Sequence, residues 1–88
     1  MRVELLGPLR SVAGKRFVEL DVEGRIRLSE LLNRLGEGLR RFVVDDLGKP
    51  QPGVLILVNG VDVRYLSWLE TEIEDGDTVT LIPSIHGG

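Results

Sequence analysis

The chain is 88 residues long, 42% hydrophobic and 28% charged, which suits one folded domain and excludes both a two-domain protein and a compositionally disordered one. It contains no cysteine, which excludes disulfides, a thiol nucleophile, thiolate zinc sites and cysteine-ligated iron–sulfur clusters. The formal net charge of −3 is uneven, with nine Lys/Arg against six Asp/Glu in residues 1–44 and two against eight in residues 45–88. This distribution favours a basic partner for the C-terminal half and argues against nucleic-acid binding.

The N-terminal quarter of the chain predicts a β-hairpin. Residues 1–6 alternate apolar and polar side chains, as in a half-buried strand, and Gly7-Pro8 ends this strand. The alternation resumes in residues 17–22, where three aliphatic side chains share one face. We therefore expect two paired strands joined by a turn within residues 7–15.

Leucines with helical spacing follow the hairpin. Leu28, Leu31, Leu32 and Leu35 follow the i, i+3, i+4, i+7 pattern, which places all four on one face of a helix. Either Arg27 or Ser29 begins this helix, and Gly36 ends it in a left-handed conformation. Three more apolar residues repeat at the same spacing and predict a short second helix between Gly36 and Gly53, namely Leu39, Phe42 and Val43.

The next segment predicts a second hairpin. Residues 54–58 are an uninterrupted apolar run, and Asn59-Gly60 tolerates the positive φ angles of a type I′ turn, which pairs this run with residues 61–63. The run is the longest of its kind in the chain and is far shorter than the about 20 residues that cross a bilayer. Since the N-terminus also lacks an apolar signal segment, we expect a soluble, cytoplasmic protein with no membrane partner.

An acidic segment precedes the last strand. After an apolar connection in which we expect Trp68 to pack, residues 70–77 hold five carboxylates in eight residues. Their spacing lacks the ligand series of a calcium loop, so we expect an exposed acidic loop that steers a partner and no metal site. Thr78–Ile82 alternates again and predicts a final strand, ended by Pro83.

The order of these elements is strand, strand, helix, strand, short strand, strand. A crossover helix lies across one face of a mixed sheet, and the terminal strand pairs most economically beside the first. This indicates an α+β fold of the ubiquitin-like β-grasp type, with a mixed sheet of about four to five strands and one main helix packed across one face. We assign residues 1–82 to this domain and residues 83–88 to a flexible C-terminal tail. The predicted core contains Val3, Leu5, Leu20, Leu31, Leu35 and Leu81.

The β-grasp order, the segments Val58-Asn59-Gly60 and 74–79, and the terminal Gly87-Gly88 together resemble the ubiquitin-like sulfur-carrier and modifier family over essentially the whole chain. That family includes the small subunit of molybdopterin synthase, the thiamine-pathway sulfur carrier, the ubiquitin-related modifier and the small archaeal modifiers. The resemblance implies that the C-terminal carboxylate, here that of Gly88, is adenylated with ATP by an activating enzyme and then converted to a thiocarboxylate. A diglycine suits this role, because a chain without side chains can enter a narrow active site.

The resemblance also implies partners. The chain would be a protein substrate and not itself an enzyme, since His86 is its only histidine and no Ser/His/Asp triad is available. It would bind no cofactor tightly, because the activating enzyme of the ubiquitin-activating type uses the ATP. The acceptor would be the large subunit of molybdopterin synthase, a tRNA thiolation enzyme, or lysines of target proteins, and the chain alone would be a monomer. The alternative is a ubiquitin-like interaction domain whose tail carries no chemistry.

A partner-binding surface is expected beside the tail. Leu6 and Ile82 should lie on adjacent parallel strands, on the sheet face away from the helix, and Ile56 should join them. Apolar side chains that cluster on an exposed sheet face usually mark an interface. Ile85 and His86 in the tail complete the predicted partner-binding residues. In the position of His86 the chain resembles the ubiquitin-related modifier, which also has a histidine before its diglycine. At Ile82 it differs from the molybdopterin synthase subunit, which has an aromatic docking residue there.

Overall fold

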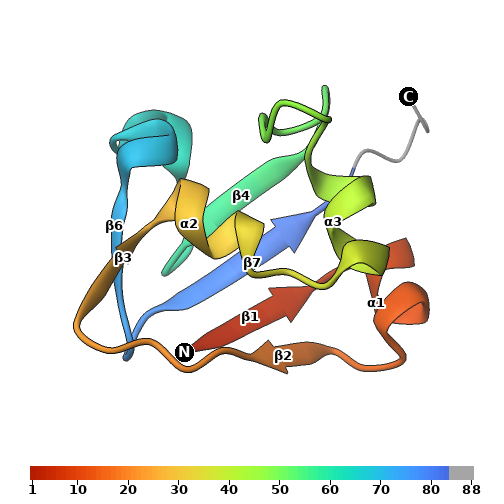
Figure 1. Cartoon of the computed structure of the whole chain (residues 1–88), viewed down its shortest axis with the longest axis horizontal. Coiled ribbons are helices and arrows are strands. Elements are labelled where there is room, and N and C mark those ends of the chain that lie inside the picture. Colours follow the sequence, from red (N-terminus) through yellow and green to blue (C-terminus); the bar gives the residue numbers. More distant parts are fainter. Residues whose placement is uncertain (84–88) are drawn as a thin grey trace.

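A five-stranded mixed sheet organises residues 1–83, the part of the chain that the computed structural model describes. Its strand order is β2-β1-β7-β4-β5 (Figure 1), with β1 and β7 parallel and the other neighbours antiparallel. A two-stranded sheet, β3-β6, lies at one end of the molecule. The elements in chain order are β1 (Arg2–Leu5), α1 (Pro8–Ala13), β2 (Phe17–Glu19), β3 (Arg25–Arg27), α2 (Leu28–Asn33), α3 (Glu37–Val43), β4 (Leu55–Val58), β5 (Val61–Asp62), the 3₁₀ helices η1 (Val63–Tyr65) and η2 (Trp68–Glu70), β6 (Glu72–Glu74) and β7 (Thr78–Ile82).

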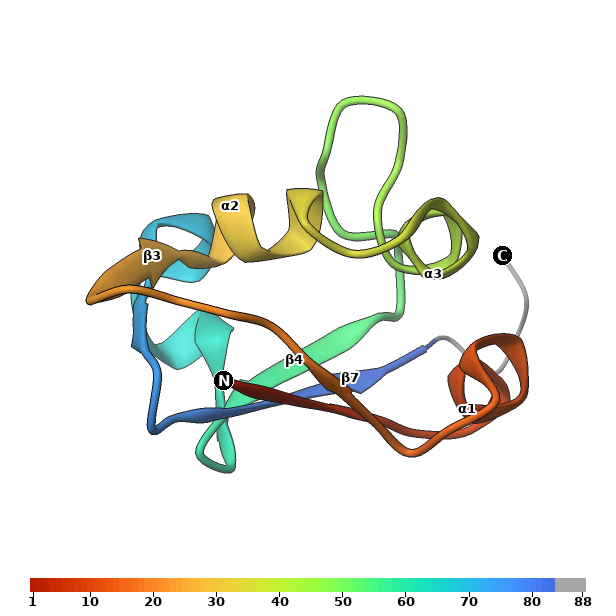
Figure 2. The ribbon, with the colours of Figure 1, turned by 60° about the horizontal axis from the view of Figure 1, so that its bottom comes forward.

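The helices α2 and α3 lie over one face of the main sheet (Figure 2). The four leucines that predicted a helix, residues 28, 31, 32 and 35, are all buried. They belong to one core cluster with the sheet residues that point to the same side, namely Val3, Leu5, Ile56, Val58, Val79 and Leu81. Removal of this apolar surface from water is the dominant favourable term in folding. The predicted ubiquitin-like β-grasp fold is confirmed.

The pairing of β1 with β7 joins the two ends of the described chain. Val3 lies opposite Val79 and Leu5 lies opposite Leu81, and all four side chains are completely buried. The expectation that the terminal strand lies beside the first is therefore confirmed. Leu20, which was expected in the core, is only partly buried and packs against the edge of the core cluster.

The connection between the first two strands is a helix and not the turn predicted for residues 7–15. α1 begins at Pro8, whose fixed φ and missing N–H suit the first position of a helix. It ends at Gly14, which has a φ of 73° and donates its N–H to the carbonyl of Arg10 at 2.8 Å. The prediction is wrong because a proline that ends a strand equally suits the start of a helix, and only the burial of Leu9 in the core decides between them.

Gly36 separates the two helices that cover the sheet. Of the two residues predicted to begin the first helix, Arg27 and Ser29, it is Arg27 that precedes α2 as its N-cap, in an extended conformation. Gly36 has a φ of −59° and is the N-cap of α3. The predicted left-handed end of the first helix is therefore wrong, whereas the predicted short second helix is confirmed by α3.

Residues 70–77 do not form one continuous acidic loop. Their central segment is β6, which pairs antiparallel with β3 and buries Ile73 opposite Ile26. Two strands of three residues, each with one apolar side chain between charged ones, carry too little alternation to be found in the sequence. The connection before β6 also differs from expectation, since Trp68 is exposed and has a φ of 52°.

The hairpin of β4 and β5 confirms the predicted turn. Asn59 and Gly60 have φ angles of 50° and 83°, as a type I′ turn requires. The Asn59 side chain also accepts the N–H of Thr78 and donates to the Asp77 carboxylate, both at 2.9 Å. These bonds tie the turn to the start of β7.

The leucine face of α2 gives the first prediction. Leu35→Ala should lower the free energy of unfolding by about 2 to 5 kcal/mol, because Leu35 is only 4% exposed and truncation leaves a cavity. The matched control is Leu47→Ala, since Leu47 is 82% exposed and its truncation should change stability by less than about 0.5 kcal/mol. Urea denaturation of both variants measures the difference, and equal midpoints would contradict the assigned core.

Candidate functional site

The described chain ends where α1 begins. Pro83 is buried, and its Cγ lies 3.7 Å from the position that a Cβ on Gly7 would occupy. The N–H of Leu6 donates to the carbonyl of Leu81 at 3.1 Å, which continues the pairing of β1 with β7 to this point. Pro83, which follows the central strand β7, therefore lies beside the start of α1. The predicted site residues Ile85, His86, Gly87 and Gly88 lie outside the described residues.

The sheet face opposite α2 and α3 carries an apolar patch. Within residues 1–83 no α-helix covers this face (Figure 2). Leu55 and Leu57 of β4 alternate with the buried Ile56 and therefore point to it, and Leu55 lies opposite Ile82 of β7. Leu6 extends the same face beyond β1. We call this half-buried group, Leu6, Leu55, Leu57 and Ile82, the open-face patch.

The structure places two of the three sheet residues of the predicted patch on the expected face. Leu6 and Ile82 are neighbours on the face away from the helices, as expected. Ile56 is 2% exposed and lies opposite Leu81 in the core, so its placement in the patch is wrong. Residues 54–58 are all apolar, and such a run has no alternation that tells one face from the other. The missed residues, Leu55 and Leu57, become identifiable only through the register that pairs Leu55 with Ile82.

A polar contact crosses the middle of the open face. Thr80 lies between Glu4 on β1 and Leu57 on β4 in the strand registers. Its hydroxyl donates to the Glu4 carboxylate at 3.3 Å, and Thr80 itself is buried. The patch is therefore apolar on both sides of one satisfied hydrogen bond, a composition that suits a protein contact.

An ion pair lies at each of the two edges of the open face. On β1 and β2 the Arg2 guanidinium lies 3.1 Å from Glu19 and 4.6 Å from the centre of the Phe17 ring. On the opposite edge the Arg64 guanidinium lies 2.7 Å from Asp62. The hydrogen bond from the Arg64 side chain, helped by its backbone N–H, holds the pKa of the Asp62 carboxyl below its usual value. Each edge of this face therefore carries an ion pair whose two charges compensate each other.

The carboxylates of residues 70–77 are used within the fold. Glu70 lies 3.1 Å from Arg27, and Glu72 and Glu74 lie 3.4 and 2.9 Å from Arg25, whose pKa these two carboxylates raise. In the same segment, Asp75 accepts from the ammonium of Met1 at 2.7 Å, and Asp77 accepts from the backbone N–H of Glu74. This compensation weakens the prediction that the segment steers a basic partner.

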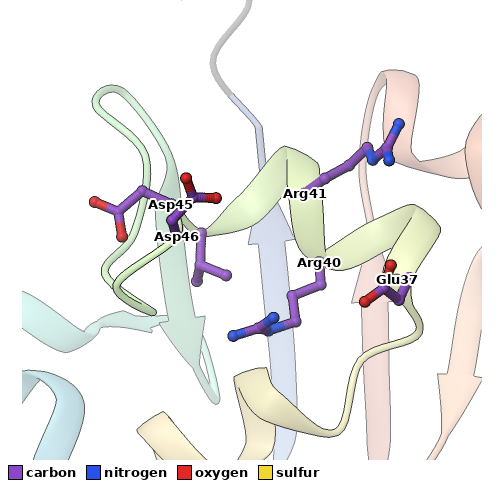
Figure 3. A pocket seen from close by; sticks show the side chains of 6 residues that line it. Glu37, Arg40, Arg41, Asp45 and Asp46 are labelled. Atoms are coloured by element: carbon purple, nitrogen blue, oxygen red, sulfur yellow. The ribbon is translucent and has the colours of Figure 1, made fainter.

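A hollow of about 240 Å³ lies beside α3 (Figure 3). Its lining mixes both charges and consists of Glu37, Arg40, Arg41, Val44, Asp45 and Asp46. The Asp45 carboxylate accepts the backbone N–H groups of Leu47 and Lys49, both at 2.9 Å, so it stabilises its own turn. No three His, Asp or Glu side chains within residues 1–83 are arranged to hold a metal ion. None of the helices in this part of the chain is long and apolar enough to span a membrane.

Comparison with known proteins links this geometry to small carriers and modifiers. The model of the ThiS family matches residues 3–88, a range that includes Gly87 and Gly88. A ubiquitin-related modifier 1 homolog of Dictyostelium discoideum is 33% identical over 96 residues, covering 100% of this chain and 98% of the relative. A putative sulfur carrier protein of Archaeoglobus fulgidus is 36% identical over 75 residues, covering 81% of this chain and 83% of the relative.

The similarity extends to three-dimensional structure. A chain in the crystal structure of the Amycolatopsis orientalis BexX/CysO complex superposes with a TM-score of 0.79 at 28% identity. The superposition covers 99% of this chain and 98% of that chain. The two chains therefore share one fold over almost their whole length.

The two faces of β4 give the second prediction. Ile56→Ala should lower the free energy of unfolding by about 2 to 5 kcal/mol, because Ile56 is in the core. Leu57 follows it in the sequence but points to the open face, so Leu57→Ala should lower the free energy of unfolding clearly less. Thermal melting followed by circular dichroism measures both. A larger loss for Leu57→Ala would reverse the assignment of the two faces.

Proposed function

Since the chain belongs to the ThiS family of ubiquitin-like sulfur carriers and modifiers, we propose that its reactive group is the C-terminal carboxylate of Gly88. An activating enzyme of the ubiquitin-activating type joins this carboxylate to the α-phosphate of ATP, which forms an acyl adenylate and releases pyrophosphate. A sulfur nucleophile at the oxidation level of hydrosulfide then attacks the acyl carbon, so that a C–S bond forms as the C–O bond to AMP breaks, and the product is a thiocarboxylate. The chain is a substrate in this sequence and not an enzyme.

The family match through residue 88 is the observation that carries this proposal. The matched range includes a diglycine, and the described chain ends just after the central strand β7, with Pro83 packed beside Gly7. The five residues after Pro83 span about 16 Å when extended at about 3.3 Å per residue. This reach is sufficient to bring the Gly88 carboxylate into the active site of a partner while the folded domain stays outside.

The chemistry has to come from the partner. A carboxylate oxygen is a poor leaving group, and the chain has no thiol and only one histidine, which lies in the tail. The ATP and its binding site accordingly belong to the activating enzyme. The thiocarboxylate then delivers sulfur for molybdopterin synthesis or tRNA thiolation, or the activated carboxylate is joined to lysines of target proteins, in the cytoplasm.

The open-face patch is the proposed docking surface for the activating enzyme. Its four side chains are apolar and half-buried, and Ile82 is separated from the tail only by Pro83. A domain held at this patch has its tail next to the contact, so the Gly88 carboxylate is confined near the active site and does not have to find it by diffusion. A protein partner is supported by the BexX/CysO crystal structure, in which a chain similar to this one is part of a complex.

The docking proposal gives the third prediction. Ile82→Asp should raise KM for the carrier at least about tenfold in ATP–pyrophosphate exchange with the cognate activating enzyme, because a carboxylate in an apolar contact must be desolvated. Val61→Asp is the control, since Val61 is exposed on β5 and lies outside the patch. Equal KM values for the two variants, with unchanged circular-dichroism spectra, would place the contact on another surface.

The tail gives the fourth prediction. Deletion of Gly88 leaves the carboxylate about 3.3 Å short of its position, and errors of about 1 Å already cost about a hundredfold in rate. ATP–pyrophosphate exchange should therefore nearly vanish, although the fold and the melting temperature stay the same. Gly87→Val should slow exchange through its added bulk.

Gly76→Val is the matched control for this experiment. Gly76 lies in the turn before β7, and a Cβ there meets no atom within 4 Å. This variant should exchange as fast as the unchanged protein. Full activity of the Gly88 deletion would overturn both the sulfur-carrier and the modifier function.

A further inference from the structure

The cations of this protein fall into two groups. Five of its eleven Lys/Arg form ion pairs with carboxylates, and these five are Arg2, Arg25, Arg27, Arg34 and Arg64. The other six form no ion pair within residues 1–83, and they are Arg10, Lys15, Arg16, Arg40, Arg41 and Lys49. Five of these six belong to α1, to the turn after it, or to α3.

These two helices lie at the same end of the molecule and pack against each other (Figures 1 and 2). Residues 7–16 and 37–43, which contain them, hold five Lys/Arg and one Asp/Glu. The remainder of the chain holds six Lys/Arg and thirteen Asp/Glu. The excess of cations remains when the turn after α3 is included, since residues 7–16 and 37–49 hold six Lys/Arg and three Asp/Glu. A protein with a net charge of −3 therefore has one positive end, and α1 at this end begins beside Pro83.

Exposed apolar side chains lie within this positive end. Val12 on α1 is 42% exposed and Phe42 on α3 is 48% exposed. A Cβ on Gly38 would lie 4.0 Å from Cγ1 of Val12, so the Gly38 side of α3 faces α1. Phe42 is four residues after Gly38 and therefore lies on the same side of the helix.

The two arginines of α3 diverge. Arg40 donates to the Asn33 side chain at 3.2 Å, and Arg41 points away from Asp45 and Asp46 (Figure 3). Helical geometry at 3.6 residues per turn puts Arg41 within about 60° of Gly38 around the helix axis, on the side of α1. We call the group formed by Val12, Lys15, Arg16, Arg41 and Phe42 the α1–α3 surface.

We propose that the α1–α3 surface is a second contact for the activating enzyme, and that this enzyme meets it with an apolar pocket bordered by Asp and Glu side chains. The inference rests on the proposed function. Complementary charge at the border accelerates encounter and fixes orientation, while the apolar centre supplies the contact itself. Together with the open-face patch, this surface flanks the point at which the tail leaves the domain, so the two contacts fix the direction in which the tail enters the active site.

A protein fits this surface better than a nucleic acid. Affinity for nucleic acid comes mostly from cations that neutralise phosphates, and here the centre of the surface is apolar while the rest of the chain carries an excess of carboxylates. Binding of tRNA is therefore tested as the competing outcome.

The test compares two double variants of equal net charge. Lys15→Ser/Arg41→Ser removes two positive charges from the α1–α3 surface, and Tyr65→Glu/Ser67→Glu adds two negative charges among exposed residues of the η1–η2 region, at the other end of the long axis (Figure 1). Both change the net charge from −3 to −5. ATP–pyrophosphate exchange with the cognate activating enzyme is measured at about 50 mM and about 500 mM NaCl, a range over which the Debye length falls severalfold.

Lys15→Ser/Arg41→Ser should raise KM for the carrier about five- to tenfold at low salt and less than about twofold at high salt, with kcat unchanged. Tyr65→Glu/Ser67→Glu should leave KM within about twofold. Phe42→Ala should raise KM at both salt concentrations, because its contact is apolar, and Leu47→Ala serves as its exposed control.

Four results would overturn the inference in distinguishable ways. An equal rise of KM in the two double variants at low salt would mean that only net charge matters, and an unchanged KM in both would mean that the enzyme does not contact this surface. Loss of fluorescent tRNA binding in Lys15→Ser/Arg41→Ser, with KM unchanged, would assign the surface to nucleic acid. No exchange with the unchanged protein would overturn the proposed function itself, and the inference with it.

Discussion

The parallel pairing of β1 with β7 is the contact on which the other features depend. It brings residues from the two ends of the described chain into one register, with Val3 against Val79 and Leu5 against Leu81 in a completely buried layer beneath α2. Such a pair closes a very long loop, so its entropic cost is recovered only when the apolar side chains of the crossover helices cover it. The predicted core, the open face and the exit of the tail all follow from this one register.

Because side chains alternate along a strand, the register also separates two functions of the sheet. The residues that face α2 and α3 hold the fold together, and the residues between them form the open-face patch. Ile82 belongs to the patch and Leu81 to the core, so neighbouring residues of β7 lie on opposite faces of the sheet. Side chains of the proposed docking surface can therefore be changed without loss of the core.

The charged side chains also divide the molecule into two regions. Around β3 and β6, arginines and carboxylates from distant parts of the chain compensate one another, and exposed pairs of this kind contribute little to stability. Around α1 and α3 the cations have no such partners within residues 1–83. The molecule therefore presents a compensated end and a positive end, and Pro83 lies beside α1 at the positive one.

The sequence by itself determined the leucine stripe of α2, the turn at Asn59 and Gly60, the inward face of β7 and the ubiquitin-like fold, because each rests on local periodicity or on a turn that only certain residues allow. It did not determine α1, since Pro8 suits either the end of a strand or the start of a helix. It missed the pairing of β3 with β6, whose strands are too short to show alternation. Only the tertiary structure placed Ile56 in the core and Leu55 and Leu57 on the open face, because a strand of uniformly apolar residues has no preferred face until its partner sets the register.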